Sequence, residues 1–239
     1  MTAAPADPQQ FAEQVATVCA VYAAAPALEA LGIHVLSTDE MTGIQALERA
    51  APTLPMHPGK VERREFEYVR HGTQSLIANF QVATGQVVTP SLGPTRTEAD
   101  FVAHIARTIA ADPGASYLFL VDQLNTHQSE GLVRLVAEVE EYPGDLGVKG
   151  ESGILRSMTS RAAFLSDPHR WIQFVYLPKH TSWLNQIELW FSILVRRLLR
   201  RASFPSTDEL RAQILAFIAY VNRHAKPFRW TYTGRHLSA

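Results

Sequence analysis

Apolar positions along the chain recur with two different periods, and the period changes from one segment to the next. Residues 7–22 carry apolar side chains at helical spacing, which predicts a helix that ends near Pro26. Residues 33–40, IHVLSTDE, are instead β-branched and apolar and predict a strand. That strand runs directly into acidic residues, so its polar end differs in character from its apolar beginning.

The middle of the chain favours strands first and then a helix and a further strand. The Ala-Thr-Gly stretch between two apolar runs is typical of a tight hairpin, which implies antiparallel pairing. The strand at 117–122, YLFLVD, repeats the pattern of an apolar run that ends in a carboxylate. The predicted elements are strands at 64–72, 75–85 and 86–93, a helix at 97–110 and a strand at 117–122.

The last part of the chain predicts helices around one more strand. A Ser-x-x-Glu capping box at Ser206 marks the start of the final helix. The predicted elements are a helix at 128–142, a strand at 171–178, a helix at 182–201 and a helix from 206. Three antiparallel strands followed by strands that alternate with helices predict an α/β fold with a mixed sheet flanked by helices. We expect a helical linker at 1–32 and one catalytic domain at 33–239.

Composition narrows the class of protein. The chain has 239 residues, 46% of them hydrophobic, and a single cysteine, Cys19. One cysteine excludes an internal disulfide framework and fits a reducing compartment. We saw no apolar run of membrane-spanning length and no signal peptide, so we expect a cytoplasmic protein without a membrane partner.

Charge is distributed unevenly along the sequence. Residues 1–155 hold nine Lys and Arg against nineteen Asp and Glu, whereas residues 156–239 hold thirteen against four. Chance segregation on one folded surface is the simple explanation. The alternative is a polyanionic partner for the basic C-terminal third.

Three carboxylates stand out against this background. Asp39 and Asp122 each follow an apolar strand, and Glu188 lies about 40° from Leu184 on the helix at 182–201, at the edge of its apolar stripe. Each acid alone has a structural explanation, as a cap or in an ion pair. If the two strands are neighbours, however, the helix can bring Glu188 to both aspartates.

A cluster of three carboxylates needs neutralisation, because two such charges 4 Å apart repel by about 4 kcal/mol at an effective dielectric near 20. Shared protons or hard divalent cations can both supply it. An oxygen-only donor set suits Mg²⁺ or Mn²⁺, and two ions would support an in-line phosphoryl displacement. A glycosidase-like acid and base pair is the competing chemistry, but it leaves the arginine-rich helix without a role.

The residues around these acids resemble the DDE transposases of the mariner superfamily, in the bacterial insertion-sequence branch. The stretches that carry the resemblance are STDEMTGIQALERAAPTLP at 37–55, REFEYVRHGTQSLIANFQVATGQVV at 64–88, LVDQLNTH at 120–127 and YLPKHTSWLNQIELWFSILVRRLLRR at 176–201. It covers residue 35 to the end. The 66 positions between Asp122 and Glu188 include an expected insertion at about 141–170.

The resemblance implies a ribonuclease H-like fold and an Asp39, Asp122 and Glu188 triad that holds two Mg²⁺ ions, for which Mn²⁺ can substitute. It implies a cut-and-paste transposase, an endonuclease and strand-transfer enzyme that acts on DNA as a homodimer and moves an insertion sequence. The residues expected at DNA are Lys179, His180, Asn185, Arg196, Arg197, Arg200 and Arg201, with Asn125 and His127 in support. The alternative role for Asn125, His127, Lys179, His180 and Asn185 is to orient the acids.

Family members also carry helix-turn-helix domains before the catalytic domain, and the residues before 35 are too few to form them. The alternative function is therefore a truncated, non-catalytic remnant that binds DNA or dimerises.

Overall fold

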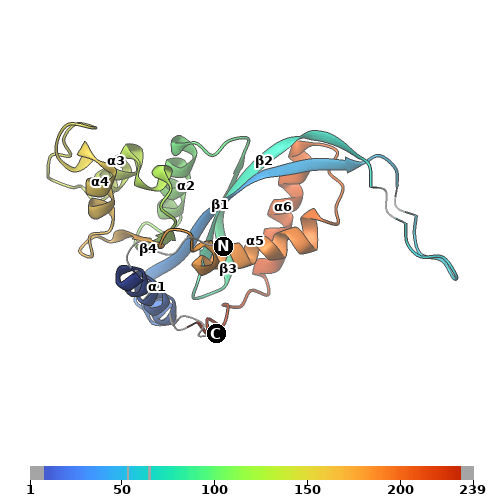
Figure 1. The fold of residues 1–239 in the computed structure, drawn as a ribbon, viewed down its shortest axis with the longest axis horizontal. Helices are drawn as coiled ribbons and strands as arrows, with labels where there is room; N and C mark the ends of the chain where they lie inside the picture. Colours follow the sequence, from blue (N-terminus) through green and yellow to red (C-terminus); the bar gives the residue numbers. More distant parts are fainter. Residues whose placement is uncertain (1–7, 53, 64–65, 233–239) are drawn as a thin grey trace.

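The computed structural model describes residues 8–52, 54–63 and 66–232. These residues form a five-stranded sheet with the order β3-β2-β1-β4-β5 (Figure 1). The strands are β1 (Ile33–Arg49), β2 (Tyr68–Gln81), β3 (Gln86–Gly93), β4 (Ser116–Val121) and β5 (Ile172–Tyr176). β2 pairs antiparallel with β1 and β3, whereas β4 pairs parallel with β1 and β5. The sheet is therefore mixed, as predicted.

Helices cover both faces of the sheet. The α-helices are α1 (Pro8–Glu29), α2 (Glu98–Ala111), α3 (Glu130–Val139), α4 (Met158–Leu165), α5 (Gln186–Leu194) and α6 (Thr207–Asn222). Short turns are η1 (Asn125–Gln128), η2 (Ile154–Arg156), η3 (Ser182–Leu184) and the π-helical η4 (Val195–Leu199). One core contains buried residues of α1, α5 and α6, and the other contains those of α2, α3 and α4. The sheet separates the two cores.

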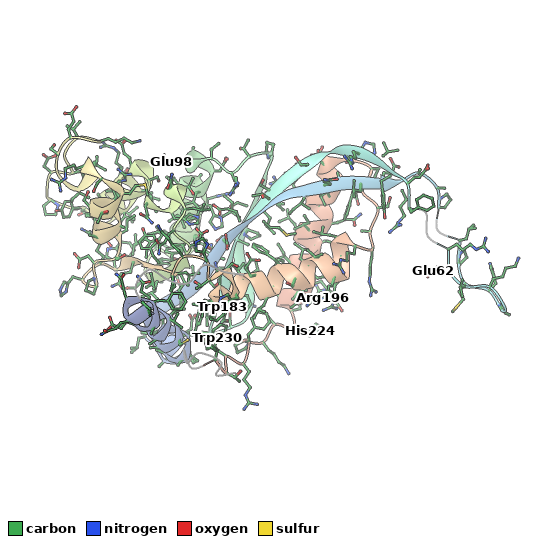
Figure 2. All side chains as sticks on the ribbon, viewed as in Figure 1. Glu62, Glu98, Trp183, Arg196, His224 and Trp230 are labelled. Atoms are coloured by element: carbon green, nitrogen blue, oxygen red, sulfur yellow. The ribbon has the colours of Figure 1, made fainter. Side chains whose placement is uncertain are left out.

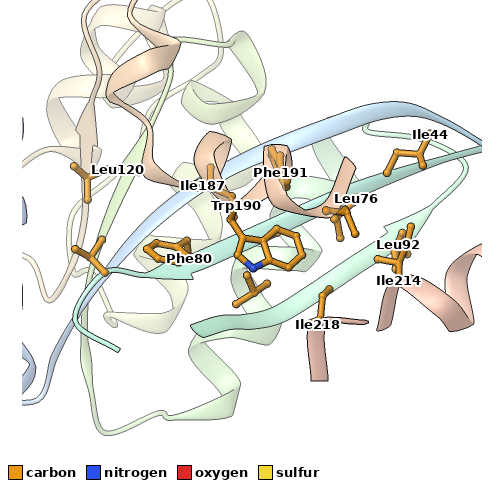
Figure 3. Close-up of a cluster of buried hydrophobic side chains, with 14 of the residues drawn as sticks. Ile44, Leu76, Phe80, Leu92, Leu120, Ile187, Trp190, Phe191, Ile214 and Ile218 are labelled. Atoms are coloured by element: carbon orange, nitrogen blue, oxygen red, sulfur yellow. The ribbon is translucent and has the colours of Figure 1, made fainter. Parts of the chain in front are cut away.

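Aromatic and branched side chains fill the core beneath α5. Trp190 is 1% exposed and lies among residues of β2, α5 and α6, where Phe80 and Ile218 are also buried (Figure 3). Trp183, in contrast, is 50% exposed, and its ring meets that of Tyr232 edge to face.

β1 and β2 form a long twisted ribbon that reaches beyond the rest of the molecule (Figure 1). Two sequence-based boundaries change as a result. The strand expected at 33–40 continues to Arg49. The strands expected at 64–72 and 75–85 meet in one strand, β2 (Tyr68–Gln81), and positions 64–65 of the first lie outside the described residues. Antiparallel pairing from Leu36–Gln81 to Arg49–Tyr68, with two register shifts between Met41 and Leu47, supplies backbone partners along most of the ribbon, even where the side chains are polar.

The N-terminal helix also differs from expectation. α1 continues through Pro26 and ends at Glu29. Its inner face is buried, and the Tyr22 hydroxyl donates to the carbonyl of Leu184 over 2.8 Å, so tertiary packing outweighs the helix-breaking tendency of proline. By length and composition α1 is apolar enough to cross a membrane, which corrects the expectation that no segment reaches that limit.

The segment at 141–170, expected as an insertion, contains η2 and α4. Arg161 in α4 is 8% exposed. Its Nε donates to the carbonyl of Gln128 over 2.7 Å, and its Nη1 donates to that of Leu155 over 3.1 Å. The segment thereby holds η1, the turn that follows β4.

Candidate active site

The register of two parallel strands places Asp39 beside Asp122. Ser37 of β1 pairs with Leu120 of β4, so two residues further along each strand brings Asp39 level with Asp122. Neighbouring strands are about 4.8 Å apart, and residues separated by two positions share a face. Asp39 lies within β1 rather than at its end, because β1 continues into the ribbon. Asp122, in contrast, directly follows the last residue of β4.

Asp39 is buried and held by two donors. It is 8% exposed; its Oδ1 accepts from the backbone N–H of Glu40 over 2.8 Å, and its Oδ2 accepts from Nδ2 of Asn185 over 3.1 Å. The pKa of Asp39 is raised to about 7, chiefly by burial; the charges of Asp122, Glu40 and Glu188 add to the rise, and the hydrogen bond from the Glu40 N–H opposes it. The site therefore accumulates negative charge that a cation would relieve.

Asp122 is half-buried and bonded to a histidine. His127 Nδ1 lies 2.8 Å from Asp122 Oδ1, which also accepts from the backbone N–H of Leu124 over 3.0 Å. Burial raises the pKa of Asp122, but the hydrogen bond and charge of His127 outweigh it, so the pKa is lowered overall.

His127 is fully buried and lies between two carboxylates, because its Nε2 lies 3.1 Å from Oε1 of Glu40. Burial lowers the pKa of His127, yet Asp122 and Glu40 raise it to about 10, which makes the ring a cation that donates at both nitrogens.

Glu188 reaches the site in the first turn of α5. The backbone N–H of Ile187, one residue earlier, donates to Ser37 Oγ over 3.0 Å, and Ser37 Oγ donates to the side-chain oxygen of Asn185. β1 therefore holds the N-terminus of α5. Burial raises the pKa of Glu188, and the charge of Asp122 raises it further.

Whether these residues suit a divalent metal depends on donor chemistry and on geometry. All three candidate ligands are carboxylates, the donors that Mg²⁺ and Mn²⁺ prefer, and their mutual repulsion is what bound cations would relieve. Across residues 8–52, 54–63 and 66–232, however, no group of three His, Cys, Asp or Glu side chains is arranged to hold an ion. Protein donors hold Asp39 and Asp122 in their present orientations. The donor chemistry therefore fits a divalent ion. Bringing the three carboxylates together around an ion requires movement of their side chains.

A groove of ≈ 550 Å³ extends from Glu188 along α5 and η4. Ser192, Arg196 and Arg200 line it at successive steps of four residues from Glu188. A step of four residues is longer than one α-helical turn, so side chains four apart drift around an α-helix. The π turn has more residues per turn, and Arg200 therefore stays on the same side of the helix as Arg196. Arg196 is labelled on this helix in Figure 2. The π turn thus aligns two exposed arginines with a candidate catalytic carboxylate.

The remaining residues expected at DNA fall in different places. Arg197 lies over the ring of Phe217 at 6.0 Å, and Arg201 lines a second groove with Arg49. Lys179 and His180 are exposed on the loop after β5. Asn185 corrects the prediction, because it is 0% exposed and holds Asp39 instead of facing solvent. Of the supporting pair, Asn125 is exposed and His127 is buried.

Sequence reasoning missed three residues of the site. Ser37 and Glu40 lie on either side of Asp39 within the same motif, and Arg96 lowers the pKa of Asp122 through its charge. Glu40 stood next to a candidate ligand in sequence, which was a usable signal. Arg96 carried none, since only the fold brings the loop before α2 to the end of β4.

A model of one protein family, the DDE superfamily endonucleases, matches residues 34–211, which is most of the chain. This chain belongs to the DDE superfamily endonucleases. The match includes Asp39, Asp122 and Glu188 and ends within α6. Comparison with curated proteins gives no match.

Two solved structures of the Mos1 mariner transposase are similar to this DDE endonuclease domain. The paired end complex with Mn aligns with a TM-score of 0.50 and 13% identity over 92% of this chain, and the pre-cleavage transpososome with 0.50 and 12% over 92%. The likeness confirms the predicted ribonuclease H-like fold. The chain spans 57% and 58% of the length of those two chains.

Proposed function

We propose that this domain is the catalytic part of a mariner-superfamily transposase of the bacterial insertion-sequence branch. It cleaves DNA strands and transfers them in cut-and-paste transposition, with two Mg²⁺ ions for which Mn²⁺ can substitute. The observation that carries the proposal is the placement of Asp39, within β1, level with Asp122, which directly follows the parallel strand β4, while α5 presents Glu188 to them. DNA is the partner, and we infer a homodimer in the cytoplasm without a membrane partner.

Asp39, Asp122 and Glu188 would hold the ions. When bound, divalent ions stabilise the attacking and leaving oxygens of a phosphoryl displacement. Protein groups orient these carboxylates: Asn185 and the Glu40 N–H hold Asp39, and His127 holds Asp122. The carboxylate cluster needs neutralisation, and bound divalent ions would supply it. Metal-dependent chemistry therefore fits these residues better than a glycosidase-like acid and base pair.

Arg196 and Arg200 form the surface on which we propose that DNA binds. Both guanidinium groups border the groove that begins at Glu188, and each can pair with a backbone phosphate without reading the base sequence. A strand in this groove would place one of its phosphates beside the carboxylate cluster. The glycosidase alternative has no use for cations in this position.

Nicking of supercoiled plasmid tests the proposal. We expect nicked product with Mg²⁺ or Mn²⁺, none with EDTA, and loss of product in the variants Asp39→Asn, Asp122→Asn and Glu188→Gln, because an amide is a poor ligand for these ions. Asp145→Asn is the matched control, since this exposed carboxylate lies far along the insertion. Nicking that survives Asp122→Asn would exclude the proposed site.

The second candidate function is a non-catalytic remnant that binds DNA or dimerises. Metal titration separates the two. An intact site gains about 2.7 kcal/mol of stability at an Mn²⁺ concentration 100 times the dissociation constant, whereas a decayed site gains none. Thermal unfolding with and without Mn²⁺, in the wild type and in Asp122→Asn, measures the difference.

A further inference from the structure

Glu40 and His127 are hydrogen-bonded to each other inside the protein, directly beneath the candidate site. Glu40 follows Asp39 in β1, and because side chains alternate along a strand, it projects from the opposite face of the sheet. Its side chain is 2% exposed and that of His127 is 0% exposed. Glu40 Oε1 accepts from Nε2 of His127 over 3.1 Å, while Oε2 is buried without a partner among the described residues.

The imidazole ring of His127 is fixed on several sides. Its centroid lies 4.2 Å from that of the Phe101 ring, and its backbone carbonyl accepts from the hydroxyl of Tyr176 over 2.9 Å. Nδ1 lies 3.2 Å from the backbone carbonyl of Asp122 and 2.8 Å from the carboxylate oxygen Oδ1 of the same residue. The ring therefore contacts Asp122 at both its main chain and its side chain.

Asp122 needs such a contact because it has left the sheet. β4 ends at Val121, and the Asp122 side chain is 41% exposed. Among the described residues, the hydrogen bonds to its carboxylate all go to Oδ1, from Leu124 and His127. This leaves Oδ2 as the oxygen that can turn toward a ligand while Oδ1 stays anchored.

We propose that Glu40 and His127 are positioning residues that hold Asp122 for metal binding, and that Glu40 is not itself a ligand. The inference rests on the proposed function. Glu40 orients the ring from one face of the sheet, and the ring orients the Asp122 carboxylate at the other. β1 thereby controls two ligands with two successive residues: Asp39 directly, and Asp122 through Glu40 and His127.

The rival assignment makes Glu40 a fourth ligand, since it is adjacent to Asp39 and its residue borders the groove that contains Glu188. The two assignments predict different effects when the carboxylate of Glu40 is replaced by the amide of glutamine. Glutamine at position 40 can still accept from His127 Nε2, but it is a poor ligand for Mn²⁺. Glu40→Gln therefore preserves a positioning role and destroys a ligand role.

Isothermal titration with Mn²⁺ measures this difference in the full chain. We expect Glu40→Gln to stay within about threefold of the wild type, and Glu40→Ala and His127→Ala to bind Mn²⁺ about 10- to 100-fold more weakly. The double alanine variant should lose no more Mn²⁺ affinity than the more affected of the two single variants, because both residues act through one contact. Glu48→Ala is the matched control: Glu48 lies in β1 like Glu40, but outside the site, and pairs with His71 of β2 over 2.7 Å.

Two outcomes overturn the inference. If Glu40→Gln loses as much Mn²⁺ affinity as Asp122→Asn, Glu40 is a ligand. If Glu40→Ala binds Mn²⁺ as tightly as the wild type, Glu40 has no role in metal binding. If the alanine variants do not fold, the volume-preserving pair decides: His127→Gln, whose amide cannot span both carboxylates, should weaken Mn²⁺ binding while Glu40→Gln does not. Equal affinities in that pair contradict the proposal.

A metal-free readout separates this inference from the proposed function. If the wild type binds no Mn²⁺, the metal part of the proposed function fails. Crystal structures of the metal-free wild type and of the folded variant, Glu40→Ala or His127→Gln, then still test the positioning role. We expect the Asp122 carboxylate to leave its wild-type orientation, and an unchanged orientation would overturn the inference.

Discussion

Nδ2 of Asn185 lies 3.1 Å from Oδ2 of Asp39, so the residue that precedes α5 is bonded to the central carboxylate of β1. The same amide nitrogen donates to the carbonyl of Thr38 over 3.1 Å. Asn185 thus joins helix and strand at the point where Glu188 approaches the aspartates. Its role is to set the spacing of the site.

The first prediction concerns this contact. Asn185→Ala removes the partner of Asp39 and of the Ser37 hydroxyl inside the protein, and we expect a loss of about 1–3 kcal/mol in the free energy of unfolding. Urea denaturation of the metal-free protein measures it. Asn125→Ala, at an exposed position, should change stability by less than about 0.5 kcal/mol. Equal effects of the two substitutions would contradict the structure.

The second prediction concerns the groove along η4. Arg196→Gln and Arg200→Gln should each reduce the slope of log affinity against log salt by about 1 for duplex DNA, because each removes one phosphate contact. Arg197→Gln is the control, since that guanidinium lies over Phe217 rather than in the groove. Fluorescence anisotropy at several salt concentrations measures the slopes. A larger change for Arg197 than for Arg196 would place the DNA on another face.

The third prediction concerns Arg96, whose positive charge acts on Asp122. Arg96→Gln should bind Mn²⁺ slightly more tightly, because a cation near the site repels the metal. The same variant should bind DNA more weakly, because it has lost a cation that attracts phosphate. Titration calorimetry and anisotropy measure the two affinities. Arg96→Lys should restore both, and a change of the same sign in both affinities would refute the assignment.

The fourth prediction concerns pH and a cluster at the opposite end of β1. His34 Nδ1 lies 3.1 Å from Glu29 and Nε2 lies 3.0 Å from Asp112. Burial lowers the pKa of His34, but these two carboxylates outweigh it and raise the pKa above the ordinary histidine value of 6.5. The stabilisation is therefore complete below pH 6.5 and is lost as the pH rises through the higher folded-state value.

His34→Gln should accordingly lower the melting temperature more at pH 5.5 than at pH 9. Differential scanning calorimetry across this range measures the difference. His169→Gln, at an exposed position, is the control for loss of a histidine. A destabilisation by His34→Gln that grows with pH would show that the sign of the coupling is opposite.

Much of the architecture was predictable from local pattern. The capping residue Thr97 begins α2 where the periodicity placed it, and β3 occupies the predicted range 86–93. The boundaries that failed depend on long-range pairing: β1 continues to Arg49 because β2 supplies its partners, and α1 continues through Pro26 because its inner face is packed. The intrinsic secondary-structure preferences of these residues predict neither extension.

The sequence by itself determined which acids to consider, because apolar runs that end in Asp39 and Asp122 and a helix edge that carries Glu188 are visible without coordinates. Only the tertiary structure decided their spacing. The register Ser37–Leu120, the contact between Asn185 and Asp39 and the buried pair of Glu40 and His127 join residues up to 146 positions apart. Such contacts depend on how strands and helices pack, and no local pattern of side chains encodes them.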